Sequence, residues 1–172
     1  MNPKAFFDAM ERRAQADTSV IATLRRSLAE APGTYAPAFP LVEPHAGGLH
    51  EAARRTLYLA AGLWATGQRR GQGAPTGLVD AVQKVARQRD SKSVEQRFVA
   101  LLDADADELV WRLRHLVQLV ASEGVSIDWP ALLADLLAWQ HPERRVQQRW
   151  ARQYWRVPAA HPDAPAPLDA AE

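Results

Sequence analysis

The chain has 172 residues, 47% of them hydrophobic, which favours a single domain with a sizeable core and excludes a disordered protein. The absence of cysteine excludes disulfides, thiolate catalysis and cysteine-ligated zinc. No apolar run reaches the ~18 residues that span a bilayer and no signal peptide is recognisable, so we expect a cytoplasmic protein without membrane contact. The net charge is only +1, but a basic stretch at 84–97 precedes an acidic block at 103–108.

Helical spacing of apolar residues and helix-start signals predict about eight helices. Asn2 followed by Pro3 starts the first, in which Phe6, Phe7 and Met10 form an apolar face. The second begins at the capping residues 17–19 and ends at Pro32. The others are expected at about 49–66, at about 77–89, after Ser93, after Asp107, after Asp128 and at 143–156.

Three stretches lack this periodicity. Residues 32–48 are rich in proline and glycine and predict an irregular connection, while the glycine-rich stretch 67–77 predicts a flexible loop between the halves of the chain. Residues 157–172, rich in proline and alanine, predict a disordered tail. No segment shows the alternation of apolar and polar residues that is typical of a β-strand. We therefore expect an all-α fold in which residues 2–156 form a single elongated helical bundle.

No catalytic or metal-binding motif is complete. Asp103, Asp105 and Asp107 begin like a calcium loop, but Glu108 stands where glycine is needed and Arg114 where a bidentate glutamate is needed. The glycines of 67–77 lack the Gly-Lys-Ser/Thr ending of a phosphate-binding loop. The five histidines lack zinc-site spacing, and no Gly-x-Ser-x-Gly sequence is present. We therefore expect no enzyme activity, no cofactor and no metal.

The last helical stretch carries a row of arginines at i, i+4, i+7 and i+11, namely Arg145, Arg149, Arg152 and Arg156. Helical geometry places them on one side and Val146, Trp150 and Tyr154 on the other. Beyond Glu143 the stretch contains no carboxylate. Such a row suits the phosphate backbone of a nucleic acid, but it also suits a solvated face whose arginines pair with acidic residues elsewhere in the fold.

An ordered set of short sequences resembles the CasB family, the small subunit of the type I-E CRISPR Cascade complex. The resemblance extends from about residue 20 to residue 155. It rests on Leu24-Arg25-Arg26, Pro37-Ala38-Phe39 with Leu41, Glu95-Gln96-Arg97-Phe98 before Leu101-Leu102, Arg112-Leu113-Arg114-His115-Leu116-Val117, and Asp128-Trp129 with Leu132-Leu133 and Trp139.

The resemblance implies a non-enzymatic subunit of an RNA-guided surveillance complex. Its partners would be the crRNA, the target DNA, the backbone and large subunits of Cascade, and a second copy of the chain. It would stabilise the crRNA–target hybrid and the displaced strand of the R-loop through contacts that do not read sequence. The alternatives are a free-standing helical DNA-binding regulator and a purely structural scaffold subunit.

The candidate nucleic-acid-binding residues come from three arguments. Basic positions that match the family are Arg25, Arg26, Arg97, Arg112, Arg114, Arg144 and Arg145, and one of the first two could instead be a buried ion-pair partner. Helix geometry adds Arg149, Arg152 and Arg156, and the basic stretch adds Lys84, Arg87 and Lys92. Helix geometry also predicts that Arg112 and Arg114 reach solvent on either side of a buried stripe.

Overall fold

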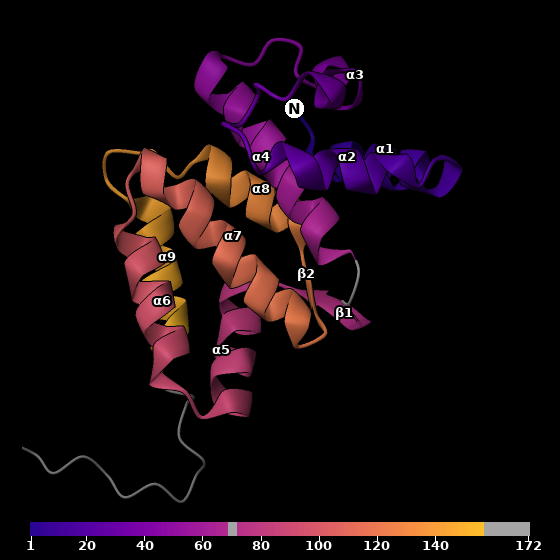
Figure 1. Ribbon diagram of the computed structural model, residues 1–172. Helices are drawn as coiled ribbons and strands as arrows, with labels where there is room; N and C mark the ends of the chain where they lie inside the picture. The colour runs from indigo at the N-terminus through magenta and orange to yellow at the C-terminus, as the bar shows by residue number, and fades with distance from the viewer. Residues whose placement is uncertain (69–71, 157–172) are drawn as a thin grey trace, which may run out of the picture.

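The computed structural model describes residues 1–68 and 72–156, and within them the fold is almost entirely helical (Figure 1). The α-helices are α1 (Pro3–Ala16), α2 (Ser19–Ser27), α3 (Phe39–Val42), α4 (Glu51–Gly67), α5 (Leu78–Arg89), α6 (Lys92–Asp103), α7 (Ala106–Ser122), α8 (Trp129–Leu137) and α9 (Arg145–Tyr154). The eight expected helices are confirmed. The short α3 is an additional helix within the expected irregular connection, flanked by 3-10 turns at Ala36–Ala38 and Glu43–His45.

The residues that cap the helices are of the predicted types, but two of the caps lie at other positions than expected. Asn2 and Asp128 cap α1 and α8, as expected, by accepting backbone hydrogen bonds from Ala5 (3.2 Å) and Ala131 (3.0 Å). The cap of α6 is Ser91 rather than Ser93, and that of α7 is Asp105 rather than Asp107. In each of these two helices, the residue two positions before the expected cap accepts hydrogen bonds from backbone N–H groups of the first turn, which have no partner within the helix.

Two short strands, which no pattern in the sequence predicts, form a parallel pair. Gln72–Thr76 (β1) aligns with Val125–Ile127 (β2), and the N–H of Asp128 donates to the carbonyl of Thr76 at 2.8 Å. The expectation of a loop throughout 67–77 is therefore wrong at β1; residues 69–71 of that loop lie outside the described residues. The pairing joins segments about fifty residues apart, so no local pattern signals it. The predicted tail, 157–172, also lies outside the described residues.

Two hydrophobic clusters form the core, and α4 contributes to both. One lies among α5, α6, α7 and α9, where Phe98, Leu113 and Trp150 are buried. The other lies among α1, α2 and α4, around Phe6 and Trp64. Figure 1 shows α1 and α2 at one end of the molecule, α5 and α6 at the other, and α4 and α8 between them. The cluster around Phe98, Leu113 and Trp150 is the larger of the two. The helices α5, α6 and α7 pack around it with one face and expose the other to solvent.

A half-buried histidine follows α3, and it predicts a pH dependence of stability. His45 packs edge-on against Phe6, with ring centroids 5.4 Å apart. Burial, together with the positive charges of Arg13 and Arg12, lowers the pKa of His45. The proton therefore binds more readily to the unfolded chain. His45 contributes fully to stability above its unfolded pKa of about 6.5, and the contribution is lost as the pH falls towards the folded value.

We expect the free energy of unfolding to fall between pH 7 and pH 5, and to fall less steeply in His45→Gln. Urea unfolding at three pH values measures both slopes. Equal slopes for the two proteins would show that His45 does not couple folding to protonation.

Candidate nucleic-acid interface

Six of the predicted binding residues have exposed side chains that make no ion pair or hydrogen bond with any described residue. We call them the unpaired basic set; its members are Arg26, Lys84, Arg87, Lys92, Arg97 and Arg156. Exposed guanidinium and ammonium groups without a carboxylate partner are free to neutralise phosphates. The set is therefore the part of the predicted site that is chemically available to a polyanion.

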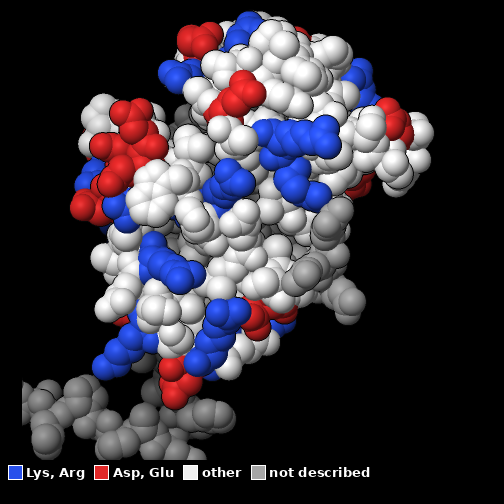
Figure 2. Space-filling view, in the orientation of Figure 1, with Lys and Arg blue, Asp and Glu red and all other residues white. Residues whose placement is uncertain are grey.

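Five members of the unpaired basic set lie in one part of the molecule. Lys84 and Arg87 are on α5, Lys92 and Arg97 are on α6, and Arg156 lies two residues after the end of α9. These three helices pack against one another. Figure 2 shows positive side chains over α5 and α6 and, further up the same face, over α2 and α4, while a negative group lies over the N-terminal end of α7. The net charge of +1 thus conceals a separation of charge.

The other seven predicted residues have partners within the fold. Arg25 and Arg114 donate to the backbone carbonyls of Ala65 (2.8 Å) and Leu28 (3.0 Å). These bonds tie α2 to α4 and α7 to the end of α2. Ion pairs join Arg112 to Glu108 (2.8 Å), Arg144 to Asp103 (3.8 Å), Arg145 to Glu143 (2.5 Å) and Arg149 to Asp135, while Arg152 donates to Gln148 (3.2 Å).

Helix α9 is shorter than predicted, and its arginine row is interrupted. The expected helix at 143–156 is corrected to Arg145–Tyr154, because Arg144 adopts a left-handed conformation with φ of 50° and Arg156 lies beyond the last turn. Asp135 of α8 pairs with Arg149, so an acidic residue from elsewhere partly compensates the row. At this position the structure favours the ion-pair alternative.

The opposite face of α9 is buried as predicted. Val146, Trp150 and Tyr154 are all less than a tenth exposed. Gln147 is also buried, and its amide donates to the carbonyl of Trp139 at 2.9 Å. Asp135 accepts a second hydrogen bond from the Trp150 indole at 2.7 Å. This role of Asp135 could not be predicted, because no local spacing links residues fourteen or fifteen positions apart on different helices.

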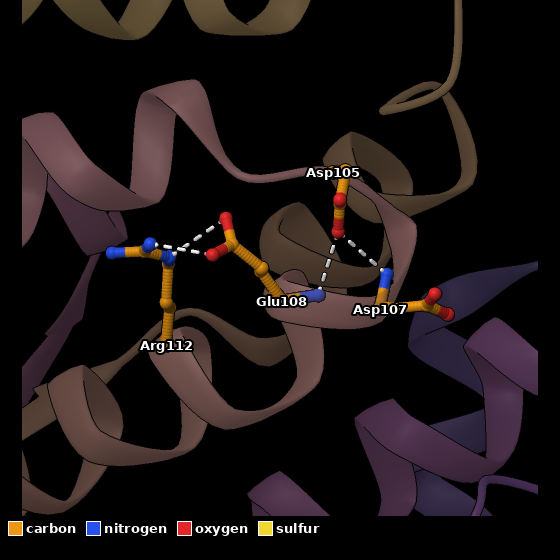
Figure 3. A network of polar contacts seen from close by, with 4 residues as sticks. All are labelled: Asp105, Asp107, Glu108 and Arg112. Carbon is orange, nitrogen blue, oxygen red and sulfur yellow. Dashed lines mark hydrogen bonds and ion pairs between the residues drawn. The ribbon is translucent and has the colours of Figure 1, made fainter.

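Arg112 is held at the start of α7 rather than extended into solvent. Its guanidinium donates twice to the Glu108 carboxylate, at 2.8 and 3.2 Å, and its side chain is 22% exposed (Figure 3). The hydrogen bond with Glu108 raises the pKa of Arg112. In the turn before it, Asp105 accepts from the N–H groups of Asp107 and Glu108. Arg112 and Arg114 are thus half-buried beside the buried stripe of α7, and each has a partner within the fold.

The described part of the chain contains neither a metal-binding cluster nor a membrane-spanning helix. Within 1–68 and 72–156, no group of three or more histidine, aspartate or glutamate side chains is arranged to hold a metal ion. None of the helices in these two ranges is both long enough and apolar enough to span a membrane.

Similarity to known proteins agrees with the fold and with the resemblance in sequence. Residues 20–155 match the family model described as CRISPR-associated protein Cse2. A Cse2 protein of Thermus thermophilus is 42% identical over 175 residues, covering 99% of this chain and 100% of that protein.

Solved structures show the same arrangement of helices. The crystal structure of CasB from Thermus thermophilus has a TM-score of 0.78 and 42% identity, covering 90% of this chain and 99% of that one. A chain from a structure of a CRISPR RNA-guided surveillance complex shares the fold, with a TM-score of 0.76, 24% identity and coverage of 89% and 91%. The match over residues 20–155, the 42% identity and the shared fold together show that this chain belongs to the Cse2 family of CRISPR-associated proteins.

Proposed function

We propose that this chain is the non-catalytic small subunit of a CRISPR RNA-guided surveillance complex of the type I-E Cascade kind. In that complex it assembles with the crRNA, the backbone and large subunits and a second copy of itself. Two observations support the proposal: membership of the Cse2 family, and the same fold in a chain from a CRISPR RNA-guided surveillance complex.

Within the complex, the subunit binds nucleic acid through phosphates rather than bases. The observation that carries this proposal is the unpaired basic set, whose charges project from the outer sides of helices and have no internal partner among the described residues. Guanidinium and ammonium groups release counterions when they neutralise phosphates, and this contribution does not depend on sequence. The crRNA reads the target by base pairing, so the subunit needs no sequence preference of its own.

Phosphate contacts of this kind suffice to stabilise an R-loop. The RNA–DNA hybrid that forms is about as stable as the duplex it replaces, so the exchange is nearly balanced. A few charge-assisted contacts, each contributing about 1.5–3 kcal/mol, therefore decide whether the open state persists. The unpaired basic set supplies such contacts to the hybrid and to the displaced strand.

A purely structural role is the second candidate. Seven of the predicted arginines form hydrogen bonds or ion pairs with side chains or backbone carbonyls of the same chain. In that case the subunit would contact other proteins and would show no salt-dependent affinity for nucleic acid. The two candidates therefore differ in a measurable property.

Assembly is tested by co-expressing the tagged chain with a CRISPR RNA precursor and the backbone and large subunits of a type I-E Cascade from the same organism. We expect crRNA and the other subunits to co-purify with the chain, and native mass measurement to find two copies of it per complex. A complete crRNA-bearing complex that excludes the chain would contradict the proposed function.

A further inference from the structure

One large aromatic side chain on α7 takes no part in the hydrophobic core. Trp111 is 48% exposed, whereas Leu113 and Val117 of the same helix are fully buried. It follows the acidic first turn of α7 and precedes the basic residues Arg112 and Arg114. Its large, rigid ring therefore stands on the outer side of α7, where it is available to a partner.

Neighbouring side chains hold the Trp111 ring in place. The guanidinium carbon of Arg112 lies over the ring, 4.7 Å from its centroid, and is itself fixed by Glu108. His115 packs edge-on against the ring at 5.7 Å, and its Nδ1 is 2.7 Å from the carbonyl oxygen of Trp111. No other described aromatic ring or cation packs on Trp111. The side chain is thus an oriented ring, covered by a cation, that remains half exposed.

The charges around Trp111 favour a negatively charged ligand towards the C-terminal side of the ring. Arg112 neutralises Glu108, whereas Asp105 and Asp107 keep their negative charges at the start of α7, before the ring. Beyond the ring lie Arg114, whose bond to the neutral carbonyl of Leu28 leaves its positive charge uncompensated, and the exposed His115. Figure 2 shows further positive side chains on this face, over α2 and α4.

An oriented aromatic ring beside positive charge is the combination with which proteins bind single-stranded nucleic acid without sequence preference. The ring stacks on an unpaired base, while the cations hold the neighbouring phosphates. A guanidinium behind the ring strengthens this arrangement, because cations and aromatic faces attract one another. A base within a duplex offers no free face, so only an unpaired strand can use the ring.

We infer that Trp111 is a stacking residue that holds an unpaired base of single-stranded nucleic acid as the strand crosses α7. The inference rests on the proposed function and adds to it a residue that distinguishes unpaired strands from duplex. The unpaired basic set treats all phosphates alike, whereas Trp111 requires an accessible base. Arg112 is then a positioning residue, since its guanidinium lies over the ring and orients it.

The test compares three probes of equal length: a 20-nucleotide single-stranded DNA, the corresponding duplex, and a strand built of stable abasic residues. The abasic strand keeps the phosphates and removes the bases. We expect the wild-type chain to bind the intact strand about fivefold or more tightly than the abasic strand. Trp111→Leu should abolish this difference while leaving affinities for duplex and abasic strand unchanged, and Trp111→Phe should retain part of it.

Phe39→Leu is the matched control, because Phe39 is an aromatic residue of similar exposure, 38%, on the distant α3. It should bind all three probes as the wild type does. Equal binding of intact and abasic strands by the wild type would overturn the inference alone. An equal loss for all three probes in Trp111→Leu, or a loss of assembly with the other subunits at unchanged affinity, would also overturn it. No binding of any probe by the wild type would contradict the proposed function as well.

Discussion

Trp150→Ala is expected to lower the free energy of unfolding by about 3–5 kcal/mol, as large truncations in a packed core do. Trp150 is 2% exposed, packs against Trp139 with ring centroids 5.1 Å apart, and lies 6.4 Å from the ring of Phe98. Alanine would leave a cavity between α6 and α9. It would also remove the indole N–H that donates a hydrogen bond to Asp135. Chemical unfolding followed by circular dichroism measures the loss.

Two variants serve as controls for this result. Trp150→Phe retains an aromatic ring but not the bond to Asp135, so it should cost less than the alanine variant. Arg149→Ala removes an exposed ion pair with the same Asp135, and we expect a change below about 1 kcal/mol. A loss for Arg149→Ala as large as that for Trp150→Ala would mean that the ion pair, rather than the packing, holds α9 in place.

Neutralising three members of the unpaired basic set is expected to weaken nucleic-acid binding by about a hundredfold or more at low salt. In the variant Arg87→Gln, Lys92→Gln and Arg97→Gln, each lost phosphate contact should also make the slope of log K against log salt less steep by ~0.7–0.9. Thermal stability should hardly change, because the three side chains are exposed and have no described partner. Filter binding of a single strand and a duplex at several salt concentrations measures both effects.

The control removes the same number of charges elsewhere. Lys4→Gln, Arg12→Gln and Arg13→Gln together take one lysine and two arginines from α1, at the end of the molecule away from α5 and α6. This variant has the same net charge as the first and should bind nearly as the wild type does. Equal weakening in both variants would show that overall charge, rather than the surface of α5 and α6, governs binding.

The helices were predictable because their signals are local. The Asn2-Pro3 start and the Asp128 cap lie beside the turns that they begin, and the apolar spacing around Leu113 gives the buried face of α7 directly. The exact caps of α6 and α7 were harder to predict. In each case two suitable residues stand two positions apart, and the sequence does not show which of them accepts the N–H groups of the first turn. The pairing of β1 with β2 is non-local and was therefore missed.

The same distinction applies to the candidate site. The exposure of Lys84 and Arg87 follows from their positions opposite the buried face of α5. The partners of Arg149 and Arg114 lie on other elements, at Asp135 and Leu28, so sequence alone left both interpretations of the arginine row open. The orientation of the Trp111 ring also depends on the Arg112 and His115 side chains, which the helical pattern does not specify.

The salt dependence of affinity tests most directly whether this subunit holds nucleic acid by its phosphates. With about four to six phosphates engaged, the slope of log K against log salt for the wild-type chain should lie at about −3 to −5, with no preference among strands of different sequence. A slope near zero, or a strong preference for one sequence, would contradict this mode of binding.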